Sequence, residues 1–170
     1  MRTARLALPL LAAALAACGG VRAVQGRPSG RDGWLVYAVR DLRFEAPATW
    51  RASGDERRVA LEAPGGGARL EISLPEQAFA DERTCLAAAQ EKLGAQQGAL
   101  ERARRHPTNF GGRPAQTLEA DQGGWHVWAL AACDGGVQYR VFFTASTPAP
   151  PAALEAWRTL LQSARLGGEV

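Results

Sequence analysis

The sequence predicts an α+β domain in which helices cover an antiparallel β-sheet. Segments of alternating apolar and polar residues lie on both sides of short glycine-containing turns, which indicates antiparallel strand pairs. Two other segments carry apolar residues at helical spacing, one before the later strands and one near the end of the chain. Strands and helices in this order are typical of α+β folds.

The chain begins with a basic and then apolar segment. Arg2 and Arg5 precede an uncharged run from Leu6 to Ala17. As a helix this run covers about 18 Å, which is too short for a hydrocarbon core of about 30 Å. Residues 1–17 are therefore predicted to form a secretion signal.

The end of this run resembles the lipobox of bacterial lipoproteins, because Leu15 is followed by Ala16, Ala17 and Cys18. The resemblance implies that the Cys18 sulfur receives a diacylglycerol, that the chain is cut before it, and that a fatty acid such as palmitate is added to the new amino terminus. The alternative is an ordinary secretory signal cut after Ala17, although such a site favours a small residue where Leu15 stands.

Lipidation predicts a location in the bacterial cell envelope, anchored to a membrane. Each buried CH₂ of an acyl chain contributes about 0.8 kcal/mol, so several chains form a lasting anchor. Gly19 follows the cysteine where an acidic residue would signal retention at the inner membrane. The periplasmic face of the outer membrane is therefore favoured.

Removal of the signal changes the charge balance. Arg2 and Arg5 leave with it, so 20 − 2 = 18 basic residues remain against 17 acidic ones, a net charge of +1. This balance gives no electrostatic reason to expect a nucleic-acid partner. Residues 18–33 are rich in Gly and Arg and are predicted to be a flexible tether. Residues 34–170 have the size of a single globular domain.

The first predicted strands lie before residue 75. One covers residues 37–43, and a hairpin joins residues 59–63 to residues 69–74 through Pro-Gly-Gly-Gly. In the second arm of this hairpin Leu70 and Ile72 face one side while Glu71 faces the other. The pair is therefore predicted to be half-buried.

A helix is predicted over residues 81–96. Asp81 can accept hydrogen bonds as its N-cap, and Leu86, Ala89 and Leu93 lie on one face with Cys85 beside them. The apolar stripe is expected to pack against the sheet.

Cys85 and Cys133 remain as an even pair once Cys18 is lipidated. In an oxidising compartment they are predicted to form a disulfide, which stabilises by about 4 kcal/mol in the chain-entropy model. A zinc site, a catalytic thiol and two inert buried thiols are the alternatives. The absence of a Cys-x-x-Cys spacing, and of a histidine near Cys85 in the sequence, disfavours the first two.

The later strands include residues near 100–106, residues 115–120, and a hairpin of residues 125–133 and 137–145 around Asp-Gly-Gly. Trp125 and Trp128 differ in parity, so they are expected to face opposite sides of the sheet. Cys133 shares the parity of Trp125, which places the helix that carries Cys85 over that face.

The last predicted helix covers residues 151–163. Pro151 fits the first turn of a helix, where its missing N–H breaks no hydrogen bond. Leu154, Trp157 and Leu161 are expected to form its buried stripe.

Four segments are similar to the PsbP-like fold, which also occurs in DcrB-like bacterial lipoproteins. They are FEAPATW (44–50), GGRPA (111–115), GVQYRVFFTAS (136–146) and LEAWRTLLQSARL (154–166). The resemblance covers most of residues 36–166. It implies an α/β/α sandwich and a binding or assembly role without a shared catalytic set, since fold alone does not define activity.

No enzyme, cofactor or metal is predicted. The sequence contains no Gly-x-Ser-x-Gly or His-Glu-x-x-His motif, and His106 and His126 belong to no recognisable constellation. Arg102, Arg104 and Arg105 form a candidate surface for an acidic partner protein of the envelope, although a solvated strand face is the ordinary interpretation.

The sequence thus favours a membrane-anchored envelope lipoprotein with a non-catalytic binding or assembly domain. The alternative function is a small-ligand carrier, or an enzyme without a recognisable motif, that uses a pocket between sheet and helix.

Overall fold

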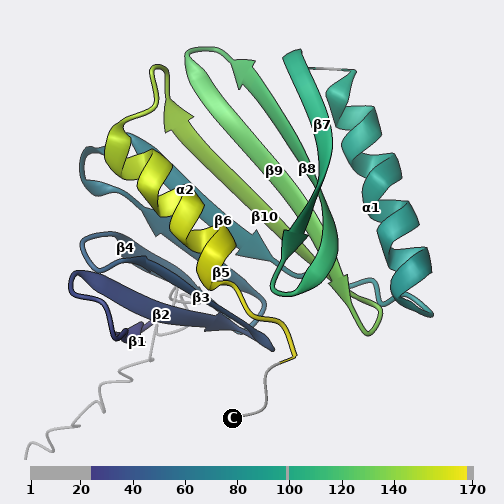
Figure 1. Ribbon diagram of the computed structural model, residues 1–170, viewed down its shortest axis with the longest axis horizontal. Helices are drawn as coiled ribbons and strands as arrows, with labels where there is room; N and C mark the ends of the chain where they lie inside the picture. Colours follow the sequence, from purple (N-terminus) through teal and green to yellow (C-terminus); the bar gives the residue numbers. More distant parts are fainter. Residues whose placement is uncertain (1–23, 99, 168–170) are drawn as a thin grey trace, which may run out of the picture.

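The computed structural model describes residues 24–98 and 100–167. Two antiparallel sheets and two helices form the domain (Figure 1). The strands are β1 (Arg27–Pro28), β2 (Trp34–Val39), β3 (Leu42–Pro47), β4 (Arg51–Asp55), β5 (Arg58–Glu62), β6 (Ala68–Ser73), β7 (Glu101–Phe110), β8 (Arg113–Gln122), β9 (Trp125–Asp134) and β10 (Val137–Ser146). The helices are α1 (Glu82–Gln97) and α2 (Pro151–Ser163), with a 3₁₀ turn η1 (Pro64–Gly66) between β5 and β6.

The larger sheet has seven strands in the order β4-β5-β6-β10-β9-β8-β7. Both hairpins that the sequence predicts are present, as β5–β6 and β9–β10. They join into one sheet because β6 pairs with β10, with Ile72 opposite Val141. The smaller sheet has the order β1-β2-β3.

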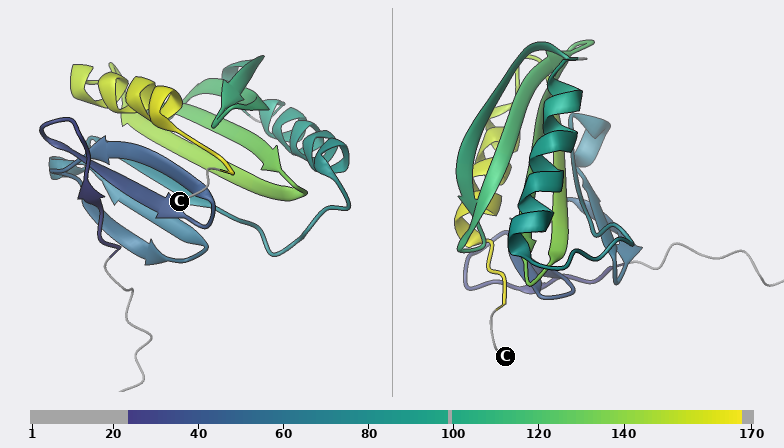
Figure 2. Two further views of the ribbon diagram at one scale, coloured as in Figure 1. Left: turned by 60° about the horizontal axis from the view of Figure 1, so that its bottom comes forward. Right: turned by 90° about the vertical axis from the view of Figure 1, so that its right-hand side faces the viewer.

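The two helices lie on opposite faces of the larger sheet, as the different views in Figure 2 show. Neighbouring residues of a strand point to opposite faces of the sheet, so Trp128 and Ala129 of β9 show which helix lies on which face. Trp128 stacks on Trp157 of α2, whereas Ala129 packs with Ala89 and Leu93 of α1. The predicted α+β architecture, a sheet between helices, is therefore confirmed.

The main core lies on the α2 side of the larger sheet, where α2 and the smaller sheet together cover it. Four aromatic rings form its centre. Phe143 lies 5.5 Å from Trp128, 5.6 Å from Trp157 and 5.9 Å from Trp50, measured between ring centroids. Aromatic packing of this kind contributes beyond the area that it buries.

Helix α1 begins as the sequence predicts. The Asp81 carboxylate accepts a hydrogen bond of 2.7 Å from the Thr84 backbone N–H, and this bond lowers the pKa of Asp81. The buried residues are Cys85, Ala89 and Leu93. Cys85 thus lies within the buried stripe and not beside it, while Leu86 is only half-buried.

The predicted disulfide is present in the structure. It joins Cys85 of α1 to Cys133 of β9 across a sequence separation of 48 residues, and both side chains are fully buried. This bond holds α1 over the face that the parity of Cys133 predicted.

Helix α2 has the predicted bounds, but its buried face is turned from the predicted stripe. Trp157 is buried as expected, whereas Leu154 and Leu161 are half-buried and Ala153 and Leu160 take the buried positions. The helix packs against both β3 and the larger sheet, so its contact surface is broader than a single stripe.

The structure corrects several predicted strands. Residues 37–43 are not one strand, because the chain reverses at Arg40 and Asp41 and forms the β2–β3 hairpin. Arg40 has φ 52°, a left-handed conformation that permits this tight turn. The strands expected at 100–106 and 115–120 are the longer β7 and β8, joined through Gly111 and Gly112. Strand β4 was not predicted.

Part of the segment 18–33 that the sequence assigns to a tether belongs to the smaller sheet. Arg27 and Pro28 pair with Val36 and Leu35 as strand β1. The Arg31 guanidinium lies 4.3 Å from the centroid of the Trp34 ring and bonds Glu155 of α2 at 2.8 Å. The ordered domain therefore includes residues before 34, whereas the predicted signal and Cys18 lie outside the described residues.

Candidate functional site

The most conspicuous surface is an apolar strip on the α1 side of the larger sheet. It consists of Trp125, Val127, Phe142 and Thr144, which we call the open-face patch. Val127 and Phe142 share this face with Ala129, because Val127 lies two residues before Ala129 and Phe142 pairs with it. Trp125 is 40% exposed and Phe142 is 47% exposed, and among the described residues these are the large hydrophobic side chains on the surface.

The patch is open because α1 covers only part of this face. The helix packs chiefly on β7, β8, β9 and the neighbouring β10, whereas β4, β5 and β6 are not among the strands that it mainly contacts. A hollow of about 690 Å³ lies beside the patch. The rings of Trp125 and Phe142 are therefore accessible at the surface.

Charged residues on β4, β5 and β6 border the patch as ion pairs. Arg58 and Arg69 both reach Glu71, at 2.6 Å and 3.3 Å, and Arg51 reaches Glu62 at 3.0 Å. Glu71 pairs directly with Phe142 in the register of the sheet. An apolar centre with a polar, internally paired border is the usual composition of a protein-binding surface.

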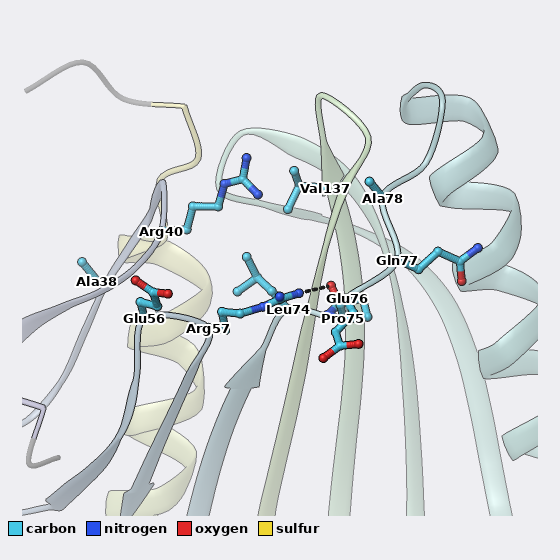
Figure 3. A pocket seen from close by; sticks show the side chains of 10 residues that line it. All are labelled: Ala38, Arg40, Glu56, Arg57, Leu74, Pro75, Glu76, Gln77, Ala78 and Val137. Carbon is cyan, nitrogen blue, oxygen red and sulfur yellow. Dashed lines mark hydrogen bonds between the residues drawn. The ribbon is translucent and has the colours of Figure 1, made fainter. Parts of the chain in front are cut away.

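A second hollow lies at the end of the sandwich where three turns meet (Figure 3). It has a volume of about 630 Å³, and Arg40, Glu56, Arg57 and Glu76 are among the residues that line it. The Arg40 Nε lies 3.3 Å from the Asp41 carboxylate, and the Arg57 Nη2 donates to the Pro75 carbonyl at 2.9 Å. The charge of Arg40 is thus paired with a carboxylate of the protein, and the exposed rings of the open-face patch are the stronger sign of a binding surface.

The three predicted arginines are exposed on β7, which is an edge strand. Arg104 and Arg105 pair with Glu119 and Leu118, so consecutive side chains point to opposite faces, and a bulge between Glu101 and Arg104 interrupts the strand. The Arg105 Nη1 donates to the Gln90 carbonyl of α1 at 3.1 Å. Arg104 and Arg105 thus point to opposite faces of β7, and the partner surface expected for Arg102, Arg104 and Arg105 stays a prediction.

The sequence interpretation missed the surroundings of His126. Its Nδ1 lies 2.7 Å from the Asp121 carboxylate and its Nε2 lies 2.8 Å from the Glu119 carboxylate. The ring is also 4.1 Å from the ring of Trp128, between centroids. The alternation of Glu119 and Asp121 on one face of β8 was the available signal, but only the β8–β9 register shows that His126 meets them.

This arrangement does not supply a free general base. Both nitrogens of His126 lie within hydrogen-bonding distance of these carboxylates, so neither is free to approach a substrate. The two carboxylates lie at opposite nitrogens of the ring, and in the part of the chain that the structure describes no group of three His, Cys, Asp or Glu could hold a metal ion. Burial raises the pKa of Tyr37 and Tyr139, which keeps both phenols neutral near pH 7.

Neither described helix is apolar and long enough to cross a membrane. Both cysteines of the disulfide are fully buried, so the bond contributes no group to the described surface. The remaining candidate on the described surface is the open-face patch, which is bordered by the ion pairs of β4, β5 and β6.

The solved structures that this protein resembles in fold include the following two chains. Cyanobacterial PsbP (CyanoP) from Synechocystis sp. PCC 6803 is 15% identical, with 89% of this chain and 98% of that chain covered and a TM-score of 0.48. PA94 from Pseudomonas aeruginosa, a protein of unknown function, is 18% identical, with 76% and 94% covered and a TM-score of 0.49. No protein-family model and no curated protein matches the sequence.

The first of these structures is a PsbP, the kind of protein that the sequence segments resemble. At such identities the likeness is one of fold, and neither an activity nor a partner follows from it.

Proposed function

We propose that this protein is a lipid-anchored, non-catalytic binding domain of a bacterial cell envelope, and that it binds a protein partner through the open-face patch. The observation on which the proposal depends is the exposure of Trp125 and Phe142 at the two ends of one strip, with the paired Val127 and Thr144 between them and the hollow beside them. Leaving a large apolar side chain in water forgoes about 1.5–3 kcal/mol that its burial would provide.

A protein is the partner that this surface fits best. Trp and Phe are enriched in the buried centres of protein interfaces, where a few aromatic side chains supply most of the binding free energy. The border of Arg58, Arg69 and Glu71 offers guanidinium donors and a carboxylate acceptor at its edge. The same ion pairs exclude water from the aromatic centre once a partner covers it.

The envelope location is supported by two features of the chain. Cys18 follows a secretion signal at the position of a lipobox cysteine. The fully buried Cys85–Cys133 disulfide fits an oxidising compartment outside the cytoplasm. Together they favour a folded domain that is exported and then held at a membrane by acyl chains.

We expect mass spectrometry of the protein purified from bacterial membranes to show a chain that begins at Cys18 and carries diacylglycerol and a further acyl group. Cys18→Ser should leave the chain uncleaved and without lipid, because serine has no thiol to receive the diacylglycerol. Cys85→Ala is the matched control and should leave the lipid in place. An unmodified Cys18 thiol on the mature wild-type chain would contradict the anchor.

We expect loss of the aromatic side chains to weaken partner binding by at least tenfold, since interface anchors of this type contribute 2 kcal/mol or more. A photo-cross-linking amino acid at Gln122, which lines the hollow beside the patch, should capture a specific envelope protein in living cells. Trp125→Ala combined with Phe142→Ala should abolish this cross-link and weaken binding of the purified partner.

The same probe at Glu91, an exposed position of α1 outside the hollow, is the control and should capture no such protein. Stability of the double variant is measured in parallel by urea denaturation. If the cross-link at Gln122 persists in a folded double variant, the open-face patch is not the binding surface.

A further inference from the structure

A narrow crevice separates α1 from the larger sheet beside the open-face patch. We call it the helix crevice, and its volume is about 170 Å³. It exists because small side chains meet there: Ala89 and Leu93 of α1 face Ala129 and Ala131 of β9. Phe142 forms a further wall, so most of the crevice is apolar.

The charged side chains that line the helix crevice are all positive. Its lining includes Lys92 and Arg140 and contains no carboxylate. Among the ion pairs of the described residues neither cation has a partner. The Arg140 Nε donates to Gln138 Oε1 at 2.6 Å, which leaves its two Nη groups available.

Arg140 is also partly removed from water. Its side chain is half-buried, and burial lowers the pKa of its guanidinium from the usual value. A desolvated cation is most stable beside an anion. The acidic residue that pairs with this part of the strand, Glu71, is already bonded to Arg58 and Arg69. Within residues 24–98 and 100–167, no carboxylate forms an ion pair with Arg140.

We propose that the helix crevice binds a small organic carboxylate, with its apolar part between α1 and β9 and its carboxylate against Arg140 and Lys92. The volume sets the size of the ligand, because an apolar cavity of about 150 Å³ accommodates benzene. A body of about six carbons therefore fits. The carboxylate gains charge-assisted hydrogen bonds, which are about twice as strong as neutral ones.

This site is separate from the proposed protein-binding surface, although Phe142 borders both. The test of the helix crevice needs no protein partner. A negative result there does not contradict the proposed protein binding, and a negative cross-linking result does not contradict ligand binding in the crevice. The helix crevice also lies between sheet and helix, where the sequence interpretation placed its alternative function of a small-ligand carrier.

The test is a titration of the mature protein, held in phosphatidylcholine nanodiscs, with hexanoate at millimolar concentrations. Backbone amide NMR signals of Ala89, Leu93, Ala129 and Ala131 should shift in a saturable way. Hexan-1-ol, which lacks the charge, should bind at least tenfold more weakly, and hexylammonium should produce no saturable shift. Absence of a saturable shift with hexanoate, or equal affinity for hexanoate and hexan-1-ol, overturns the proposal.

Variants locate the binding residues. Arg140→Gln should weaken hexanoate binding about tenfold, because a hydrogen bond to a charged group is replaced by a neutral one. Lys92→Gln should weaken it less, since its ammonium is a more mobile and better hydrated charge. Arg83→Gln, an exposed position on the same helix outside the crevice, is the matched control and should leave affinity unchanged.

A second variant tests the apolar part without changing charge. Ala131→Leu fills the helix crevice and should abolish hexanoate binding while Arg140 and Lys92 remain. Unchanged affinity in folded Arg140→Gln or in folded Ala131→Leu overturns the proposal.

Discussion

Trp157→Ala is expected to lower the free energy of unfolding by about 3–5 kcal/mol, the range for removal of a large buried aromatic side chain. Trp157 is buried at the centre of the main core. Its ring stacks on Trp128 at 5.7 Å and lies 5.6 Å from Phe143, measured between centroids. The substitution therefore leaves a cavity between α2 and the larger sheet and removes two aromatic contacts at once.

Urea denaturation monitored by circular dichroism measures this effect. Arg158→Ala is the matched control, because Arg158 is the next residue of the same helix and is exposed. It should change the free energy of unfolding by no more than about 0.5 kcal/mol. A loss below about 1 kcal/mol for Trp157→Ala would mean that α2 does not hold the core together as described.

Replacement of both disulfide cysteines, Cys85→Ala with Cys133→Ala, is expected to lower the free energy of unfolding by about 4 kcal/mol in the chain-entropy model. The bond closes a loop across 48 residues and joins α1 to β9. Without the bond the unfolded chain gains conformational freedom. Helix α1 is then held chiefly by Ala89 and Leu93, which are the remaining buried residues on its face.

Reduction provides the control for this prediction. Dithiothreitol should destabilise the wild-type protein by a similar amount, because reduction opens the loop but keeps both sulfur atoms in the core. The double alanine variant should be insensitive to dithiothreitol. A wild-type protein whose urea midpoint is the same before and after complete reduction would show that the bond contributes nothing to stability.

Local sequence signals predicted the hairpins whose turns contain glycine and the helix that begins at a proline. The β9–β10 hairpin followed from Asp-Gly-Gly between two alternating segments, and α2 followed from Pro151 and its apolar spacing. The β2–β3 hairpin was missed because its turn uses Arg40 at φ 52°, a conformation that an arginine seldom signals. Strand β1 was missed because it has two residues, which is too short to show an alternation of apolar and polar side chains.

The candidate site was predictable only in part. The opposite parity of Trp125 and Trp128 correctly placed the two rings on opposite faces of the sheet, but it did not show that Trp125 is exposed. The exposure of Phe142 was not predicted, because it depends on which strands of the sheet α1 covers. The contacts of His126 with Glu119 and Asp121, and the separation of Arg104 from Arg105, depend on strand register, which a single sequence does not specify.

The pairing of strand β1 with β2 also determines how far the domain can lie from its proposed anchor. Arg27 is fixed to the smaller sheet, and a fully extended backbone of the length between Cys18 and Arg27 would span at most about 30 Å. For a chain lipidated at Cys18, the partner must then present its binding site close to the same bilayer. Lateral diffusion in the plane of that bilayer would bring the two molecules together.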